Sequence, residues 1–166
     1  MIHDVFHFSF TVSDLDSSIA WYQEVLGLEL VHRQVQDNDY TRTLVGIPDA
    51  VLEIAQFRIP GVSPGLSTHM LELVEYRSPR SRRTEVRTSD VAAAHIAFLV
   101  TDVHTRHRRM RALGVEFRNP PVEIAEGVNR GGFSCYLRDP DGITLELLQP
   151  SPARCLELGL PAPERG

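Results

Sequence analysis

The chain carries the same strand motif twice, and this repeat constrains its fold more than any other feature. HFSFTVSD begins at His7, and HIAFLVTD begins at His95. Both segments have histidine first, phenylalanine fourth, valine sixth and aspartate eighth. In the first copy, Phe8, Phe10 and Val12 alternate with other residues, which is the period of a β-strand with one apolar face. A motif that recurs in this way predicts two structural units of the same design.

The residues after each motif agree as well. SSIAWYQEVLGLEL and HTRHRRMRALGVEF are typical of helices that end at a Leu-Gly pair, where Gly27 and Gly114 would adopt a left-handed turn. Short polar side chains before each helix favour an N-cap. The candidate N-caps are Asp14 or Asp16 in the first copy and Asp102 or Thr105 in the second. After each glycine, LELVHRQV and VEFRNPPVEI return to strand character.

The two halves also end alike. MLELVEY in the first half corresponds to TLELLQP in the second, so that Glu72 and Glu146 occupy matching places between leucines. The segment RDPDG before the second copy is typical of a tight turn. Each half therefore reads as strand, helix and three strands. We expect an α+β fold made of two tandem βαβββ modules, forming an open curved β-sheet cavity with helices on the outside.

We place the first module at residues 1–85 and the second at residues 90–150, with a C-terminal tail at 151–166 that begins as a short helix. The polar, aperiodic segment EYRSPRSRRTEVRTSD connects the modules. With 166 residues in all, we expect one structural domain overall.

Composition excludes several classes of protein. The net charge of −5 argues against nucleic acid as a partner, and no apolar run is long enough to cross a membrane. All 17 basic residues are arginine, so neither Schiff-base chemistry nor a P-loop is available. We expect a soluble, cytoplasmic protein.

The chain has two cysteines. Cys135 lies in an apolar strand-like run and is expected to be a small core residue.

The repeated polar residues suggest a metal site. Alternation places His7 on the same strand face as Ser9 and Thr11, away from the face that would meet the helices. If two equivalent sheets lie side by side, their two histidines and two glutamates point into one concavity. Two imidazoles and two carboxylates suit Zn, Ni, Co, Mn or Fe as a divalent ion, and leave positions open for water or substrate. The predicted metal ligands are His7, Glu72, His95 and Glu146.

The sequence resembles the vicinal oxygen chelate superfamily, which includes glyoxalase I, methylmalonyl-CoA epimerase, extradiol dioxygenases, and fosfomycin- and bleomycin-resistance proteins. The resemblance covers roughly residues 3–150 and is carried by HFSFTVSDLDSSIAWYQEVLGLEL, LELVEY, HIAFLVTDV and RDPDGITLELLQP, in that order. The family's metal positions fall on the four residues just named. Glyoxalase I has His or Gln, Glu, His and Glu there, which this chain matches. The epimerases have Gln in place of Glu72, and the dioxygenases and fosfomycin-resistance transferases have no glutamate there.

The resemblance implies a metal-dependent isomerase, epimerase or lyase that transfers a proton next to a metal-bound carbonyl of a small molecule. Glu72 and Glu146 are then the candidate catalytic bases. Two alternatives remain open: an Fe- or Mn-dependent oxygenase of the extradiol type, and a protein that binds a small molecule without catalysis. The resemblance also implies a homodimer, with the site built either within one chain or across two.

Other polar residues are weaker candidates. Glu53 is either a further base or, as we expect, an exposed strand glutamate. The remaining pocket candidates are His69, Tyr76, Asn129, Arg130, Tyr136 and Arg138.

The first module is longer than the second. His7 and Glu72 are 65 positions apart, whereas His95 and Glu146 are 51 apart. The extra residues lie mainly around LVGIPDA and FRIPGVSPGLSTH, where family members shape their substrate pockets.

Overall fold

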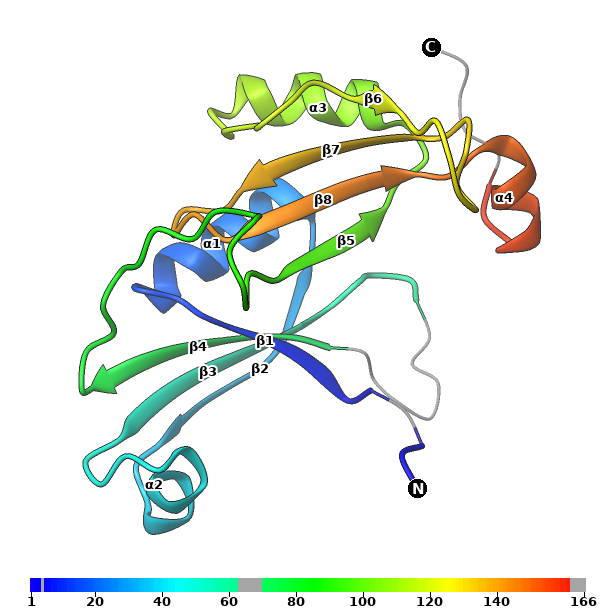
Figure 1. Cartoon of the computed structure of the whole chain (residues 1–166). Coiled ribbons are helices and arrows are strands. Elements are labelled where there is room, and N and C mark those ends of the chain that lie inside the picture. Colours follow the sequence, from blue (N-terminus) through cyan, green and yellow to red (C-terminus); the bar gives the residue numbers. More distant parts are fainter. Residues whose placement is uncertain (4, 63–69, 162–166) are drawn as a thin grey trace. The chain divides into compact units, whose positions relative to one another are not determined.

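The computed structural model describes residues 1–3, 5–62 and 70–161. The chain divides into two compact units, unit 1 from Met1 to Thr84 and unit 2 from Glu85 to Gly166. Each unit has a four-stranded sheet with helices, so the α+β fold with two modules is confirmed (Figure 1). That the two units form one structural domain stays a prediction.

Unit 1 follows the expected element order with one added helix. In chain order its elements are β1 (His7–Thr11), α1 (Leu15–Leu26), β2 (Glu29–Gln36), α2 (Asp39–Val45), β3 (Val51–Arg58) and β4 (Met70–Ser78). The strand order in the sheet is β1-β4-β3-β2, so the first and last strands of the module are neighbours. These two run parallel, while β3 is antiparallel to both β4 and β2.

Helix α1 covers one face of this sheet because its apolar residues recur at helical spacing. Leu15, Ile19 and Tyr22 are buried, as are Phe57 and Leu73 of the sheet. Strand alternation turns Leu73 away from the face that carries Glu72. The core of unit 1 therefore lies on the α1 face, and the Glu72 face is the opposite one.

The predicted helix boundaries of α1 are confirmed. The side chain of Asp14 accepts a hydrogen bond from the backbone N–H of Ser17, which makes Asp14 the N-cap. Gly27 ends the helix with a φ of 73°, a left-handed conformation that favours glycine.

Unit 2 repeats this plan with a much shorter second strand. Its elements are β5 (His95–Leu99), α3 (Val103–Ala112), β6 (Val122–Glu123), β7 (Phe133–Arg138), β8 (Thr144–Gln149) and α4 (Pro152–Glu157). The strand order is β5-β8-β7-β6, which matches unit 1 position for position. Asp102 caps α3 through the N–H of Thr105, and Gly114 follows the helix with a φ of 83°. The repeat in the sequence is thus a repeat in topology.

Two local expectations differ from the structure. The segment before Ala50 contains helix α2, whose N-cap Asn38 accepts from the N–H of Thr41 and whose last turn ends at Gly46. The strand expected in VEFRNPPVEI is reduced to β6, because Pro120 and Pro121 have no N–H to give to a ladder. The short helix expected in the tail is present as α4.

No helix among residues 1–3, 5–62 and 70–161 is long and apolar enough to span a membrane.

Candidate functional site

In unit 1, His7 and Glu72 form a pair on the sheet face opposite α1. Ser9 is in register with Glu72, and His7 lies two residues earlier on the same strand, so all three side chains share one face. The His7 Nε2 atom is 3.7 Å from the Glu72 Oε1 atom. The second carboxylate oxygen, Oε2, accepts a hydrogen bond of 2.9 Å from the side-chain amide of Gln56 on β3. Glu72 is therefore held from one side and faces an imidazole on the other.

In unit 2, His95 and Glu146 form the equivalent pair. Ala97 is in register with Glu146, so His95 again shares the face of the glutamate. The His95 Nε2 atom is 3.2 Å from the Glu146 Oε2 atom. The other oxygen, Oε1, accepts a hydrogen bond of 2.5 Å from the hydroxyl of Ser134 on β7. The two units thus build the same arrangement with different supporting donors.

Tyr136 is the neighbour of both members of the second pair. It lies in register with Glu146 on β7, and its ring centroid is 5.2 Å from that of His95. Partial burial, and then the negative charge of Glu146, raise the pKa of the Tyr136 phenol. The phenol therefore stays protonated at neutral pH and is available as a hydrogen-bond donor beside the pair. Tyr136 was among the weaker sequence candidates, and its contacts place it at the pair.

Each pair offers one imidazole nitrogen and one carboxylate oxygen, the donor set that divalent transition metals bind. The histidine side chains are 38% and 43% exposed, while the glutamates are 11% and 15% exposed. A largely buried carboxylate that accepts a hydrogen bond from a neighbouring donor is typical of a ligand whose orientation is fixed by its surroundings. Within the described residues of either unit, no third His, Cys, Asp or Glu side chain joins the pair as a possible ligand. Each pair alone supplies two ligands, half of a tetrahedral set and a third of an octahedral one.

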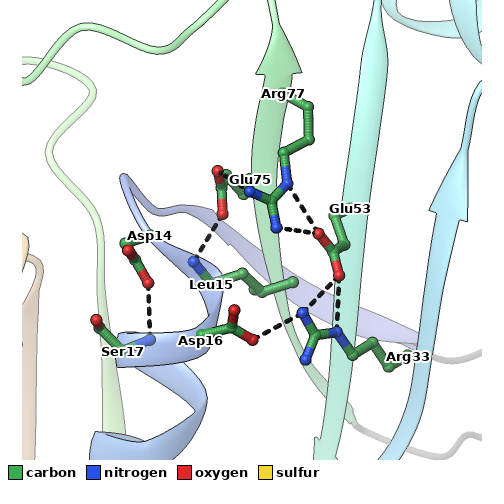
Figure 2. A network of polar contacts seen from close by, with 8 residues as sticks. All are labelled: Asp14, Leu15, Asp16, Ser17, Arg33, Glu53, Glu75 and Arg77. Atoms are coloured by element: carbon green, nitrogen blue, oxygen red, sulfur yellow. Dashed lines mark hydrogen bonds and ion pairs between the residues drawn. The ribbon is translucent and has the colours of Figure 1, made fainter.

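Glu53, predicted to be an exposed strand residue or a further base, is neither. It is only 7% exposed and lies on the α1 face of the sheet. Its carboxylate accepts from Arg77 Nε at 2.8 Å and from Arg33 Nε at 2.7 Å (Figure 2). The hydrogen bonds from Arg77 and then Arg33 hold the pKa of Glu53 below its ordinary value of 4.5, which weakens it as a base. The expectation failed because both arginines come from neighbouring strands and become partners only when the sheet forms.

The same network fixes α1 on the sheet. Figure 2 shows Asp16 of α1 bound to Arg33 and the N–H of Leu15 directed at Glu75. Arg77 also contacts Glu75, with 3.2 Å between Nη1 and Oε1. These charged groups all lie on the face away from Glu72, so they support the helix and take no part in the His7–Glu72 pair.

The other sequence candidates have local roles or lie elsewhere. Arg138 donates to the carbonyl of Gly142 at 2.5 Å and so closes the RDPDG turn. Arg130 borders a depression of about 520 Å³, whose lining residues are Glu123, Ile124, Ala125, Arg130 and Gly131. Asn129 contributes a backbone carbonyl to the N–H of Gly132. His69 lies outside the described residues. Gln56 and Ser134, which hold the two carboxylates, were missed because their contacts depend on strand register.

The chain matches the family described as the Glyoxalase/Bleomycin resistance protein/Dioxygenase superfamily over residues 4–147. It belongs to this superfamily. The match covers both modules, and the resemblance noted in the sequence motifs is thereby confirmed.

Among curated members of the superfamily, a 2-epi-5-epi-valiolone epimerase from Actinomyces sp is 36% identical over 87% of this chain and 78% of its own length. A probable lactoylglutathione lyase from Vibrio cholerae is 26% identical over 89% of this chain and 91% of its own length. These two superfamily members are thus named as enzymes of the isomerase and lyase type.

Solved structures agree on the fold. A glyoxalase family protein from Bacillus cereus has a TM-score of 0.73 at 23% identity and covers 90% of this chain and 95% of its own. A trypanothione-dependent glyoxalase I from Leishmania major has a TM-score of 0.64 at 25% identity, with coverage of 95% and 93%. The superfamily fold is therefore shared along nearly the whole chain.

Proposed function

We propose that this glyoxalase-superfamily protein is a metal-dependent epimerase that moves a proton at a carbon next to a carbonyl group of a small molecule. The observation that carries the proposal is the duplicated pair: His7 with Glu72, and His95 with Glu146, each with one glutamate oxygen held by a neutral donor. Single polar pairs are common on strands, but a His–Glu pair repeated at equivalent positions of two modules, with each glutamate held by a donor from the neighbouring strand, is typical of residues that act together.

The proposed site joins the two pairs as four ligands of one divalent ion, Zn, Ni, Co, Mn or Fe, with the pairs coming from one chain or from two chains of a homodimer. A divalent ion held there would stabilise negative charge developing on a carbonyl oxygen. The four ligands include two carboxylates and two neutral imidazoles, so the bound ion's charge is formally balanced. The metal ligands, their number and the dimer are all part of the proposal.

Glu72 and Glu146 act as the proton-transferring groups. Epimerisation requires that one base removes a proton from a carbon and that an acid returns a proton to its other face. Two carboxylates, one from each module, provide a base and an acid of the same kind. Gln56 and Ser134 orient these carboxylates, and Tyr136 lies in register with Glu146 on the neighbouring strand. An enzyme with one carboxylate could exchange the proton but would return it to the face from which it came.

Epimerase activity is preferred over lyase activity because the epimerase relative is more similar, at 36% against 26% identity. An oxygenase of the extradiol type would use only one of the two glutamates as a ligand and would need no role for the other. A sequestering protein would not need either carboxylate to be aimed at a histidine. The duplicated pair therefore favours proton transfer over both alternatives.

Proton exchange in D₂O tests this function. The metal-loaded protein is incubated with 2-epi-5-epi-valiolone, and NMR follows deuterium incorporation next to the carbonyl together with the change in configuration. We expect Glu72→Gln and Glu146→Gln each to lower the epimerisation rate by about 10²–10⁴-fold, the usual contribution of a positioned acid or base. Glu24→Gln, an exposed glutamate of α1, is the matched control and should leave the rate unchanged. The adduct of a 2-oxoaldehyde with glutathione, which rearranges to lactoylglutathione when the aldehyde is methylglyoxal, is the comparison substrate.

Full epimerisation in both glutamine variants would contradict the assignment of the carboxylates. Formation of lactoylglutathione from the methylglyoxal–glutathione adduct, with no exchange in the ketone, would show that the protein is a lactoylglutathione lyase. Oxygen uptake with catechol-type compounds, which an epimerase does not show, would establish the oxygenase alternative.

A further inference from the structure

The sheet face that carries Glu72 has an unusual pattern of polar side chains. Reading across the strands in register, Ser9 on β1, Glu72 on β4, Gln56 on β3 and His32 on β2 lie at one level. Residues in direct register on neighbouring strands point to the same face. A row of four side chains that can form hydrogen bonds therefore crosses the whole sheet through the proposed metal ligand.

The next level along the strands continues the pattern. Thr11 on β1 is in register with Val74 on β4, which pairs with Ile54 on β3, and Ile54 pairs with Gln34 on β2. Thr11 and Gln34 are exposed, while Val74 and Ile54 are buried. This level has an apolar centre between two neutral hydrogen-bonding side chains.

The two faces of this sheet differ in how many charged side chains they carry. The face toward α1 carries Arg33, Glu53, Glu75 and Arg77. On the Glu72 face, the charged side chains of the four strands beyond the His7–Glu72 pair are Arg58 and Glu29, which bind each other at 2.8 Å. Water-exposed sheet faces ordinarily carry free charges. Apart from this ion pair, the exposed side chains around the apolar centre of the Glu72 face are hydroxyls, amides and an imidazole.

Helix α2 closes one end of the same face. Leu52, Ile54 and Val74 form a buried apolar cluster, against which Val45 of α2 and Tyr76 pack. Figure 1 shows α2 at the end of the sheet where β2 finishes and β3 begins. Because Ile54 precedes Gln56 by two positions on β3, this apolar wall lies directly beside the Gln56–Glu72 hydrogen bond. In unit 2 the segment between α3 and β7 contains the short strand β6 and no such helix.

We propose that the Glu72 face of unit 1 recognises an uncharged, hydroxyl-rich substrate, with Thr11 and Gln34 as its specificity-determining residues; this rests on the proposed function of the same site. Hydroxyl groups both donate and accept hydrogen bonds, and so do Ser, Thr and Gln side chains. A phosphate or carboxylate group would need an unpaired arginine, and the arginine on this face is already bound to Glu29. The wall beneath α2 receives the carbon skeleton and limits the length of the substrate.

Direct binding measurements test the proposal apart from catalysis. Isothermal titration calorimetry on the metal-loaded protein compares neutral 2-epi-5-epi-valiolone with a phosphate ester of the same compound. We expect the neutral ketone to bind at least tenfold more tightly. Thr11→Val and Gln34→Leu should each weaken its binding by about threefold to tenfold, the usual net effect of one hydrogen bond. Gln34→Arg should shift the preference toward the phosphate ester, because it supplies the missing cation.

Gln23→Leu and Gln23→Arg, at an exposed position of α1 away from this face, are the matched controls and should change neither affinity. Equal or tighter binding of the phosphate ester to the unchanged protein, no binding of the neutral ketone, or unchanged affinities in Thr11→Val and Gln34→Leu would each overturn the proposal. Binding that follows the expected pattern without epimerisation would contradict the proposed function and leave this recognition surface supported.

Discussion

The carboxylate of Glu75 on β4 accepts a hydrogen bond of 2.8 Å from the backbone N–H of Leu15, the first residue of α1 and 60 positions earlier in the chain. Unit 2 repeats the contact with a different side chain: the amide oxygen of Gln149 on β8 accepts from the N–H of Val103 at 2.8 Å. The first N–H groups of a helix have no partner within the helix. The last strand of each module therefore satisfies one of them and fixes the helix to the sheet.

Replacing either acceptor with an apolar residue should destabilise the protein. Glu75→Leu and Gln149→Leu each leave a buried N–H without a partner, which costs about 1–3 kcal/mol in free energy of unfolding. Glu75→Gln should cost less, because Gln149 shows that an amide oxygen can make this contact. Urea denaturation followed by circular dichroism measures the differences. If Glu75→Gln and Glu75→Leu lower the free energy of unfolding by the same amount, the charge of Glu75 stabilises the protein and its hydrogen bond to α1 does not.

Glu53 should make stability depend on acid pH. Its folded-state pKa is lowered by hydrogen bonds from Arg77 and then Arg33, so the ionised form favours the folded state. This contribution is fully present above the ordinary value of 4.5 and is lost as the pH falls through the lower, folded-state pKa. Urea midpoints measured between neutral pH and about pH 3 should therefore fall less steeply in Glu53→Gln than in the unchanged protein. Parallel curves for the two proteins would contradict the assignment.

The two cysteine thiols should be unreactive in the folded protein. Cys135 and Cys155 are each 1% exposed. Burial, and then the negative charge of Glu146, raise the pKa of Cys135 to about 11, so that little thiolate exists at pH 8. A thiol reagent such as DTNB should label neither cysteine in native conditions and both in denaturant. Rapid labelling of Cys135 in the native protein would show that β7 is open to solvent.

Gly132 should tolerate no side chain. A Cβ atom at this position would lie 2.3 Å from the backbone oxygen of Gln149 and 3.0 Å from that of Asn129. Neither backbone atom can move aside cheaply, because Gln149 ends β8 beside the start of β7. We expect Gly132→Ala to lower the free energy of unfolding by about 1–3 kcal/mol or more. Gly127→Ala, where the Cβ meets nothing within 4 Å but φ is 77°, separates backbone strain from steric overlap and should cost less.

The sequence predicted those parts of the fold that depend on local patterns repeated in both halves. The strand that begins at His7, the N-caps Asp14 and Asp102 and the left-handed glycines each have a local signal, and all appear in the structure. Helix α2 was missed although it has such signals, since Asn38 precedes it and Gly46 follows it. Its seven residues are too few to show an apolar period.

Contacts between strands could not be predicted in the same way. Gln56 reaches Glu72 and Ser134 reaches Glu146 only because of the register of β3 with β4 and of β7 with β8. Glu53 was read as exposed because its two arginine partners are 20 and 24 positions away. Pair contacts of this kind depend on how strands align, which the pattern of a single strand does not contain.

The central claim is that the His7–Glu72 and His95–Glu146 pairs are halves of one metal site. Cobalt(II) titration of the metal-free protein, followed by visible absorption and metal analysis, tests it most directly. We predict one ion per chain, bound at least about 100-fold less tightly in His7→Ala and also in His95→Ala, with His3→Ala as the unaffected control. Two independent ions per chain, or one ion whose affinity is unchanged when either histidine is removed, would contradict the claim.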